Sequence, residues 1–188
     1  MVDLKKLEKA ARLILEAVGE NPMREGLLET PRRFAEMIEE QLAYTNISNE
    51  EIAKNFGKTF TSSEEGLVVV KDIPIFSYCE HHIALMYNMK VSVGYIPCGR
   101  VIGLSKVARI ADAVSKRLQI QERIGQDIRE IIEEVTDSSD VIVHIEGEHS
   151  CMTARGIKKV TSVTRTLSAG GKCKEPAWQS LFLKLCKE

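Results

Sequence analysis

Two segments rich in β-branched residues set the expected architecture of this chain: Leu67-Val-Val-Val-Lys-Asp-Ile73 and Met89-Lys-Val-Ser-Val-Gly-Tyr-Ile96. In the second segment Val91, Val93 and Tyr95 recur at every second position, so they share one face of an extended chain. These patterns predict two neighbouring strands of a sheet.

Further elements are expected on both sides of these strands. A helical region runs from Ser105 to about Val135, and Gln119-Ile-Gln121 divides it in two. Strands are expected at 141–146 and 158–167, and helices at 2–18, 30–42, 50–56 and 176–186, with Thr30 as an N-cap. The order of helices, then ββααββ, then a terminal helix predicts an α+β fold with helices on one face of an antiparallel sheet. We expect an N-terminal helical segment over 1–60 and a main domain over 61–188.

Composition narrows the class of protein. The chain has 188 residues, 44% hydrophobic and 28% charged, as in ordinary soluble globular proteins. A net charge of −1 argues against non-specific nucleic-acid binding. No run approaches the roughly 18 apolar residues of a membrane span, and residues 1–19 have helical spacing rather than a signal-peptide pattern. The five cysteines form no disulfide framework, which favours a reducing compartment. The expected location is cytoplasmic, with no nucleic-acid or membrane partner.

Two short clusters carry the chemistry: Cys79-Glu-His-His82 and His149-Ser-Cys151. Thiolate and neutral imidazole are preferred zinc ligands, so Cys79, His82 and Cys151 are candidate metal ligands. Structural zinc sites are closed by four protein ligands, whereas catalytic sites keep a position for water. Three ligands favour a catalytic site, with His81 and His149 free for proton transfer. Two other interpretations stay open: a structural site with His149 as the fourth ligand, and buried cysteines without a metal.

Other candidate residues are polar or cationic. The carboxylate of Glu122 can accept two hydrogen bonds from the N1–H and 2-amino groups of guanine, although a solvated helix start is the commoner meaning of such a residue. Lys106 and Arg109 lie about one helical turn apart and share a face, as expected of a polyphosphate clamp. The same role suits other cations near the motifs: Arg32, Arg33, Arg155, Lys158, Lys159 and Arg165. The chain has no P-loop. No role is expected for His144, or for Cys98, Cys173 and Cys186.

Six ordered motifs resemble the GTP cyclohydrolase I family. They are Gly26-Leu-Leu-Glu-Thr-Pro-Arg-Arg33, Cys79-Glu-His-His82, Tyr95-Ile-Pro97, Val101-Ile-Gly-Leu-Ser-Lys106, Gln119-Ile-Gln-Glu-Arg123 and His149-Ser-Cys-Met-Thr-Ala-Arg-Gly156. The resemblance spans about residues 16–171. It implies a tunnelling fold, in which the antiparallel sheets of several subunits join into an oligomeric β-barrel ring. It also implies a homodecamer, a dimer of pentamers, with active sites between subunits.

The resemblance also implies a reaction and roles for matching positions. The reaction is zinc-dependent hydrolytic opening of the guanine imidazole ring of GTP, release of formate, and rearrangement to 7,8-dihydroneopterin triphosphate, the first step of folate and pterin biosynthesis. The implied roles are Zn²⁺ ligation by Cys79, His82 and Cys151; proton transfer by His81, His149 and Ser105; guanine recognition by Gln121 and Glu122; and ribose or triphosphate binding by Lys106, Arg109, Arg155 and Arg33, the last from a neighbouring subunit.

Two alternatives remain beside this hypothesis. One is another tunnelling-fold enzyme, of pterin or deazapurine metabolism, that acts on the product rather than on GTP. The other is a non-catalytic zinc-stabilised oligomer with four protein ligands. The segment Ile83 to Met89 departs from the family pattern, because it lacks a Pro and a Gly and is about one residue longer. We expect a loop there.

Overall fold

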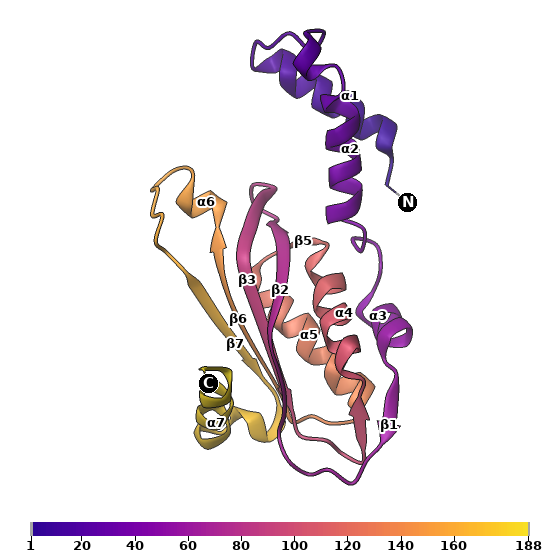
Figure 1. Cartoon of the computed structure of the whole chain (residues 1–188), viewed down its shortest axis with the longest axis vertical. Coiled ribbons are helices and arrows are strands. Elements are labelled where there is room, and N and C mark those ends of the chain that lie inside the picture. Colours follow the sequence, from indigo (N-terminus) through magenta and orange to yellow (C-terminus); the bar gives the residue numbers. More distant parts are fainter. Residues whose placement is uncertain (1, 188) are drawn as a thin grey trace.

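The computed structural model describes residues 2–187, and its centre is a five-stranded sheet of order β5-β2-β3-β6-β7 (Figure 1). The long strands are β2 (Val68–Cys79), β3 (Ala84–Tyr95), β6 (Val141–His149) and β7 (Thr164–Ala169). They pair antiparallel, while β5 (Leu118–Gln119) runs parallel to β2. A separate two-stranded ladder joins β1 (Thr59–Thr61) to β4 (Arg100–Ile102). Because these strands are antiparallel, the end of β2, the start of β3 and the end of β6 lie together at one end of the sheet.

Helices cover the two faces of this sheet unequally. On one face α4 (Leu104–Ser115) and α5 (Gln121–Thr136) pack against the strands (Figure 1). The core between them is buried and mainly aliphatic, and its fully buried members include Val91, Val93, Val143, Ile128 and Ile131. Burial of one such side chain contributes about 1.5–3 kcal/mol. This packing fixes the positions of β2, β3 and β6 relative to α4 and α5.

The opposite face carries α7 (Pro176–Lys187), preceded by η2 (Gly171–Lys174). Phe182 of α7 is fully buried against the sheet at Gly94. A Cβ at Gly94 would lie 2.8 Å from the Phe182 ring, so only glycine admits this close packing.

An N-terminal hairpin of α1 (Leu4–Ala17) and α2 (Thr30–Gln41), with η1 (Glu25–Leu27) between them, stands apart from the sheet (Figure 1). The chain then rejoins the main body through α3 (Asn49–Phe56). Arg117 fastens this junction, because its guanidinium donates to the carbonyls of Tyr44 (3.2 Å) and Ile47 (2.7 Å) and pairs with Asp127 (3.2 Å). The expected domain boundary near residue 60 stays a prediction.

The ββααββ order is confirmed, and so is the break between the two central helices, at β5. Three details were wrong. The expected loop at 83–89 belongs to β3 from Ala84 onward, because Ala84 to Met86 pair with the end of β2. The last strand begins at Thr164 rather than 158, since local turns follow the short helix α6 (Ser150–Thr153). Thr30 is the first helical residue, and Glu29 holds the N-cap position. Among the described helices, none combines the length and apolarity of a membrane span.

Candidate metal centre

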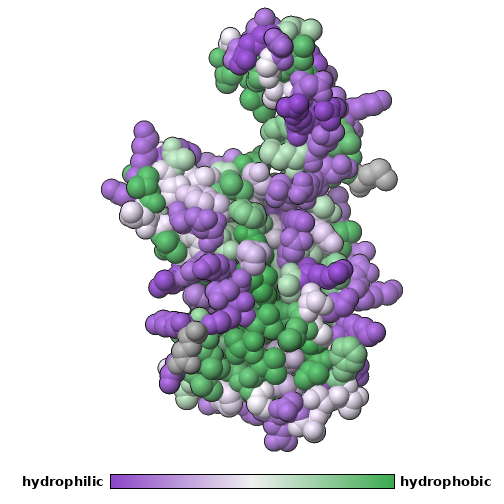
Figure 2. Space-filling view, viewed as in Figure 1, coloured by the Kyte–Doolittle hydropathy of each residue, from purple (hydrophilic) through white to green (hydrophobic). Residues whose placement is uncertain are grey.

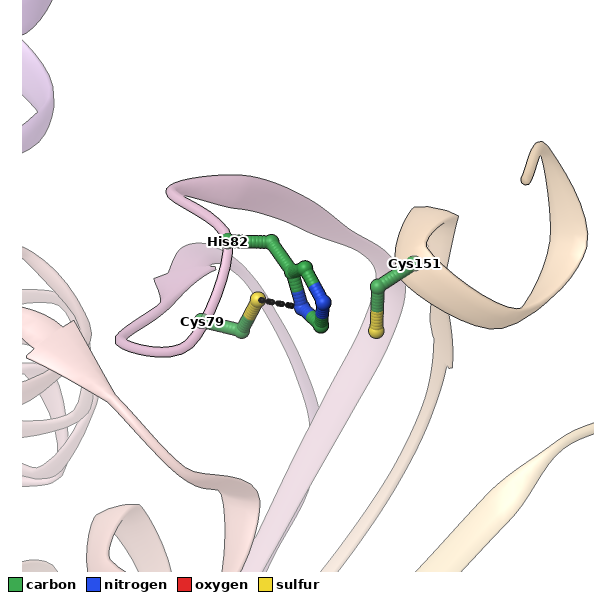
Figure 3. Close-up of side chains that lie close together, drawn as sticks. All are labelled: Cys79, His82 and Cys151. Carbon is green, nitrogen blue, oxygen red and sulfur yellow. Dashed lines mark hydrogen bonds between the residues drawn. The ribbon is translucent and has the colours of Figure 1, made fainter. Parts of the chain in front are cut away.

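The two predicted ligand motifs meet at the end of the sheet where strands β2 and β6 terminate. Cys79 closes β2, the turn at 80–83 returns the chain into β3, and α6 follows β6 directly. The ligand atoms of Cys79, His82 and Cys151 all lie within 4.8 Å of one another, and Cys79 Sγ is 3.9 Å from His82 Nδ1 (Figure 3). Tetrahedral zinc with bonds of about 2.0–2.3 Å spaces its ligand atoms about 3.3–3.8 Å apart. Small side-chain adjustments would bring the three donor atoms to this spacing.

The chemistry of the three donors also fits a soft divalent cation. Cys79 is buried, Cys151 is half-buried and His82 is exposed, so one side of the group faces solvent. Burial raises the pKa of the Cys151 thiol, and the neighbouring Cys79 raises it further. Two adjacent thiols both lose their protons readily only beside a positive charge, because the two thiolates repel each other. A bound metal would supply that charge.

His149 lies beside the cluster but outside it, because Gln121 holds its ring. The Nε2 amide group of Gln121, which is 1% exposed, donates toward the carbonyls of Ile145 (3.1 Å) and Thr164 (3.1 Å). These acceptors assign the amide orientation, so Gln121 Oε1 accepts from His149 Nε2 at 2.9 Å. The neutral His149 ring therefore keeps its free lone pair on Nδ1. Burial lowers the pKa of His149, opposed in part by the Glu122 carboxylate, and this favours the neutral ring at neutral pH.

The remaining residues near the cluster lie on the surface. His81 is exposed in the turn, with Nε2 3.9 Å from Glu80. Arg155 donates from a guanidinium nitrogen to His82 Nε2 at 3.0 Å. Glu122 is exposed and lines an open groove of about 580 Å³ between α5 and β7. Arg165, in contrast, lies away from the cluster: it pairs with Glu146 on the sheet face that carries α7.

The chain does not bring Ser105, Lys106 and Arg109 to this cluster. They lie on the first turns of α4, whereas the carbonyl of Ser115 at its other end accepts from Ser77, two residues before Cys79. Ten residues of helix span about 15 Å. Arg33 lies exposed on α2, in the hairpin that stands apart. Within one subunit, the start of α4 with Lys106 and Arg109 therefore lies far from the cluster.

Two supports of the cluster escaped the sequence analysis. The Tyr87 hydroxyl lies 2.9 Å from Thr153 Oγ1 and joins β3 to α6. Arg123 pairs with Glu80 at 2.7 Å and joins α5 to the turn that carries His82. Neither pair has a sequence signal, because each depends on which strands and helices become neighbours.

The fold and this cluster define an α+β protein in which a Cys–His–Cys group that could hold a metal ion lies beside a positioned histidine. The family model for GTP cyclohydrolase I matches residues 7–187. GTP cyclohydrolase 1 of Clostridium acetobutylicum is 56% identical over 98% of this chain and 96% of that protein. GTP cyclohydrolase 1 of Clostridium beijerinckii is 56% identical over 91% and 90%, and that of Ruminiclostridium cellulolyticum is 55% identical over 90% of each. A solved structure, the archaeosine synthase QueF-Like in the apo form, covers 58% of this chain and 97% of that chain with a TM-score of 0.47 and 21% identity.

The chain belongs to the GTP cyclohydrolase I family. The resemblance carried by its six motifs is thereby confirmed, and the chain is an enzyme of that activity.

Proposed function

We propose that this chain opens the imidazole ring of GTP at a zinc centre formed by Cys79, His82 and Cys151, releases formate and yields 7,8-dihydroneopterin triphosphate. The observation that carries the proposal is the convergence of these three donors beside a neutral, positioned His149 in a member of this family. Zinc held there would lower the pKa of a bound water to about 7 and so supply a nucleophile at neutral pH.

The chain's own residues bind the substrate and move its protons. His149, held through Nε2 by Gln121, takes a proton on Nδ1 from the water that attacks C8 and passes it to the guanine ring nitrogen that leaves C8. Glu122 accepts the N1–H and 2-amino hydrogen bonds of guanine from its groove beside β7. After a second hydrolysis releases formate, His81 and Ser105 carry protons while the ribose opens and rearranges. Loss of water then closes the new ring.

The role of Gln121 in this proposal differs from the one first expected. Its side chain is buried and its amide is bonded to protein groups, so we assign it to positioning His149. Contact between Gln121 and guanine stays a prediction. Arg155 is bonded to His82 Nε2 here. Metal binding through Nδ1 would place a proton on Nε2, end this bond and free Arg155 for the triphosphate.

We further propose that the complete site forms between subunits of a homodecamer with the tunnelling fold. The separation of Lys106 from Cys151 within one chain supports this, because both ends of the substrate need contacts. Apolar surface is also exposed: Figure 2 shows it on the N-terminal hairpin and beside α7. On the hairpin the exposed apolar residues are Leu13, Ile14, Val18, Met23, Leu28 and Met37. Thiolate ligands favour a reducing compartment, which supports a cytoplasmic location.

Mixing two inactive variants tests this arrangement. Cys151→Ser removes a metal ligand, and Lys106→Ala removes a triphosphate contact. If the site is shared, co-assembly places an intact Cys151 beside an intact Lys106 and restores activity. A mixture that stays inactive after verified subunit exchange contradicts the shared site, and light scattering measures the number of subunits.

The activity itself is tested by incubating zinc-loaded protein with GTP while following formate and dihydropterin absorbance. We expect turnover by the wild type and none by His149→Ala or Cys151→Ala. The matched controls are His144→Ala and Cys98→Ala, which lie outside the cluster and should remain active. No formate from an oligomeric, metal-replete sample would overturn the proposal, and consumption of dihydroneopterin triphosphate instead would favour the related pterin enzyme.

A further inference from the structure

A second cavity lies on the sheet face opposite α4 and α5, against the last turns of α7. Its volume is about 690 Å³. It is lined by Lys71, Asp72, Lys90, Ser92, His144, Glu146, Arg165, Thr166, Leu167, Leu183, Cys186 and Lys187. In Figure 2 polar residues gather on this face above α7. None of the proposed catalytic or metal-binding residues lines the cavity.

A β-bulge in β2 and the packing of α7 shape this cavity. A bulge interrupts the pairing of β2 between Val70 and Ile73, where Asp72 has a φ of +56°. The Asp72 amide donates to the buried Ser92 hydroxyl at 3.4 Å, which fixes the bulge at the cavity rim. Bulges of this kind redirect side chains and are frequent beside binding sites. The opposite wall is fixed by Phe182, which anchors α7 on the sheet.

The charges in the cavity favour an anion. Four cationic side chains against two carboxylates leave a formal charge of +2 with His144 neutral. One carboxylate, Glu146, is already paired with Arg165 at 3.1 Å. Half-buried His144 and buried Ser92 offer hydrogen bonds at the floor, while Leu167 and Leu183 add apolar surface. Ligand sites combine apolar walls with a few polar groups in this way, at volumes of about 300–1,000 Å³.

We propose that this cavity binds a small anion that carries two negative charges on a compact apolar body. The site is separate from the metal centre, because the five residue steps along β6 from His144 to His149 span about 17 Å. The inference does not depend on the hydrolytic activity. Strand β6 contributes to both sites, so a ligand in the cavity has a direct structural link to the strand that ends at His149.

Equilibrium dialysis of the full-length, zinc-loaded protein against isophthalate tests the proposal. Isophthalate places two carboxylates on one ring, too far apart to chelate the metal. We expect saturable binding of one isophthalate per chain at low ionic strength, undisturbed by excess GTP. In the variant Lys90→Gln/Arg165→Gln the cavity loses its excess positive charge, and affinity should fall about tenfold or more. The control Lys9→Gln/Lys54→Gln removes the same charge elsewhere on the chain and should bind as the wild type does.

Thiol labelling locates the bound molecule independently. Cys186 lines the cavity, whereas the exposed Cys98 lies outside it. Isophthalate should slow alkylation of Cys186 by N-ethylmaleimide and leave Cys98 unaffected, as read by mass spectrometry. The proposal is overturned by an absence of saturable binding, by displacement with GTP, by equal binding in both double variants, or by unprotected Cys186. None of these results alters the formate assay of the metal centre, so the two proposals fail separately.

Discussion

Replacing Gln121 with methionine tests whether this buried amide positions His149. Methionine has nearly the same length and volume, so the packing around α5 is preserved while the hydrogen bonds are removed. The Gln121 amide donates two hydrogens to acceptors on β6 and β7 and accepts one from His149. At about 1 kcal/mol for each of three hydrogen bonds, the free energy of unfolding should fall by about 3 kcal/mol.

The same substitution has a distinct kinetic signature. Without Gln121 Oε1, the His149 ring loses the bond that fixes its tautomer and orientation. The proposed contact between guanine and Glu122 would be unaffected. General acid–base catalysis contributes about 10²–10⁴-fold, so losing part of it should lower kcat about 10- to 100-fold. KM for GTP should change little. If Gln121 instead contacts guanine, KM should rise while kcat stays near that of the wild type.

Formate release and urea unfolding measure the two effects. The matched control is Gln179→Met on α7, outside the groove beside Glu122, where the glutamine amide donates to the Lys174 carbonyl at 3.2 Å. It should alter neither quantity appreciably. Wild-type kcat and unchanged stability in Gln121→Met would refute the positioning role.

Three further predictions follow from local geometry. Tyr87→Phe removes the bond to Thr153, and because α6 is then held less firmly, zinc affinity in competition with a chelator should fall about tenfold; unchanged affinity contradicts this. Ile83→Gly relieves a β-branched residue at a φ of +48°, so urea unfolding of the metal-free chain should show a gain of up to about 1 kcal/mol; a loss would show that the turn is unstrained. Burial raises the pKa of Cys173 to about 11, so at pH 8 iodoacetamide should modify exposed Cys98 and spare Cys173, and equal rates would contradict that protonation state.

The sequence predicted the elements whose patterns are local. Alternation of Val91, Val93 and Tyr95 predicted the second half of β3, and all three side chains are buried. The first half of that strand was missed because a bulge between Tyr87 and Lys90, with Asn88 at a φ of +49°, interrupts the alternation. A period of two is readable only where the pairing is regular.

In the candidate site, too, features carried by local motifs were predictable and features that depend on tertiary contacts were not. The metal-type cluster was predictable because its donors occupy two short motifs of distinctive composition. The bond between Gln121 and His149 was not, since its partners are 28 positions apart and meet only through the register of α5 on β6. The anion cavity also escaped notice, because His144 and Arg165 acquire a common environment only when β6 pairs with β7.

Titration of the metal-free protein with zinc, with formate release from GTP measured at each addition, tests the central claim most directly. The account predicts that the rate rises in proportion to zinc and levels off at one equivalent per chain. In Cys151→Ser the same additions should restore no turnover. Full activity in the metal-free wild type, or undiminished activity in Cys151→Ser, would contradict the assignment of Cys79, His82 and Cys151 as the catalytic metal centre.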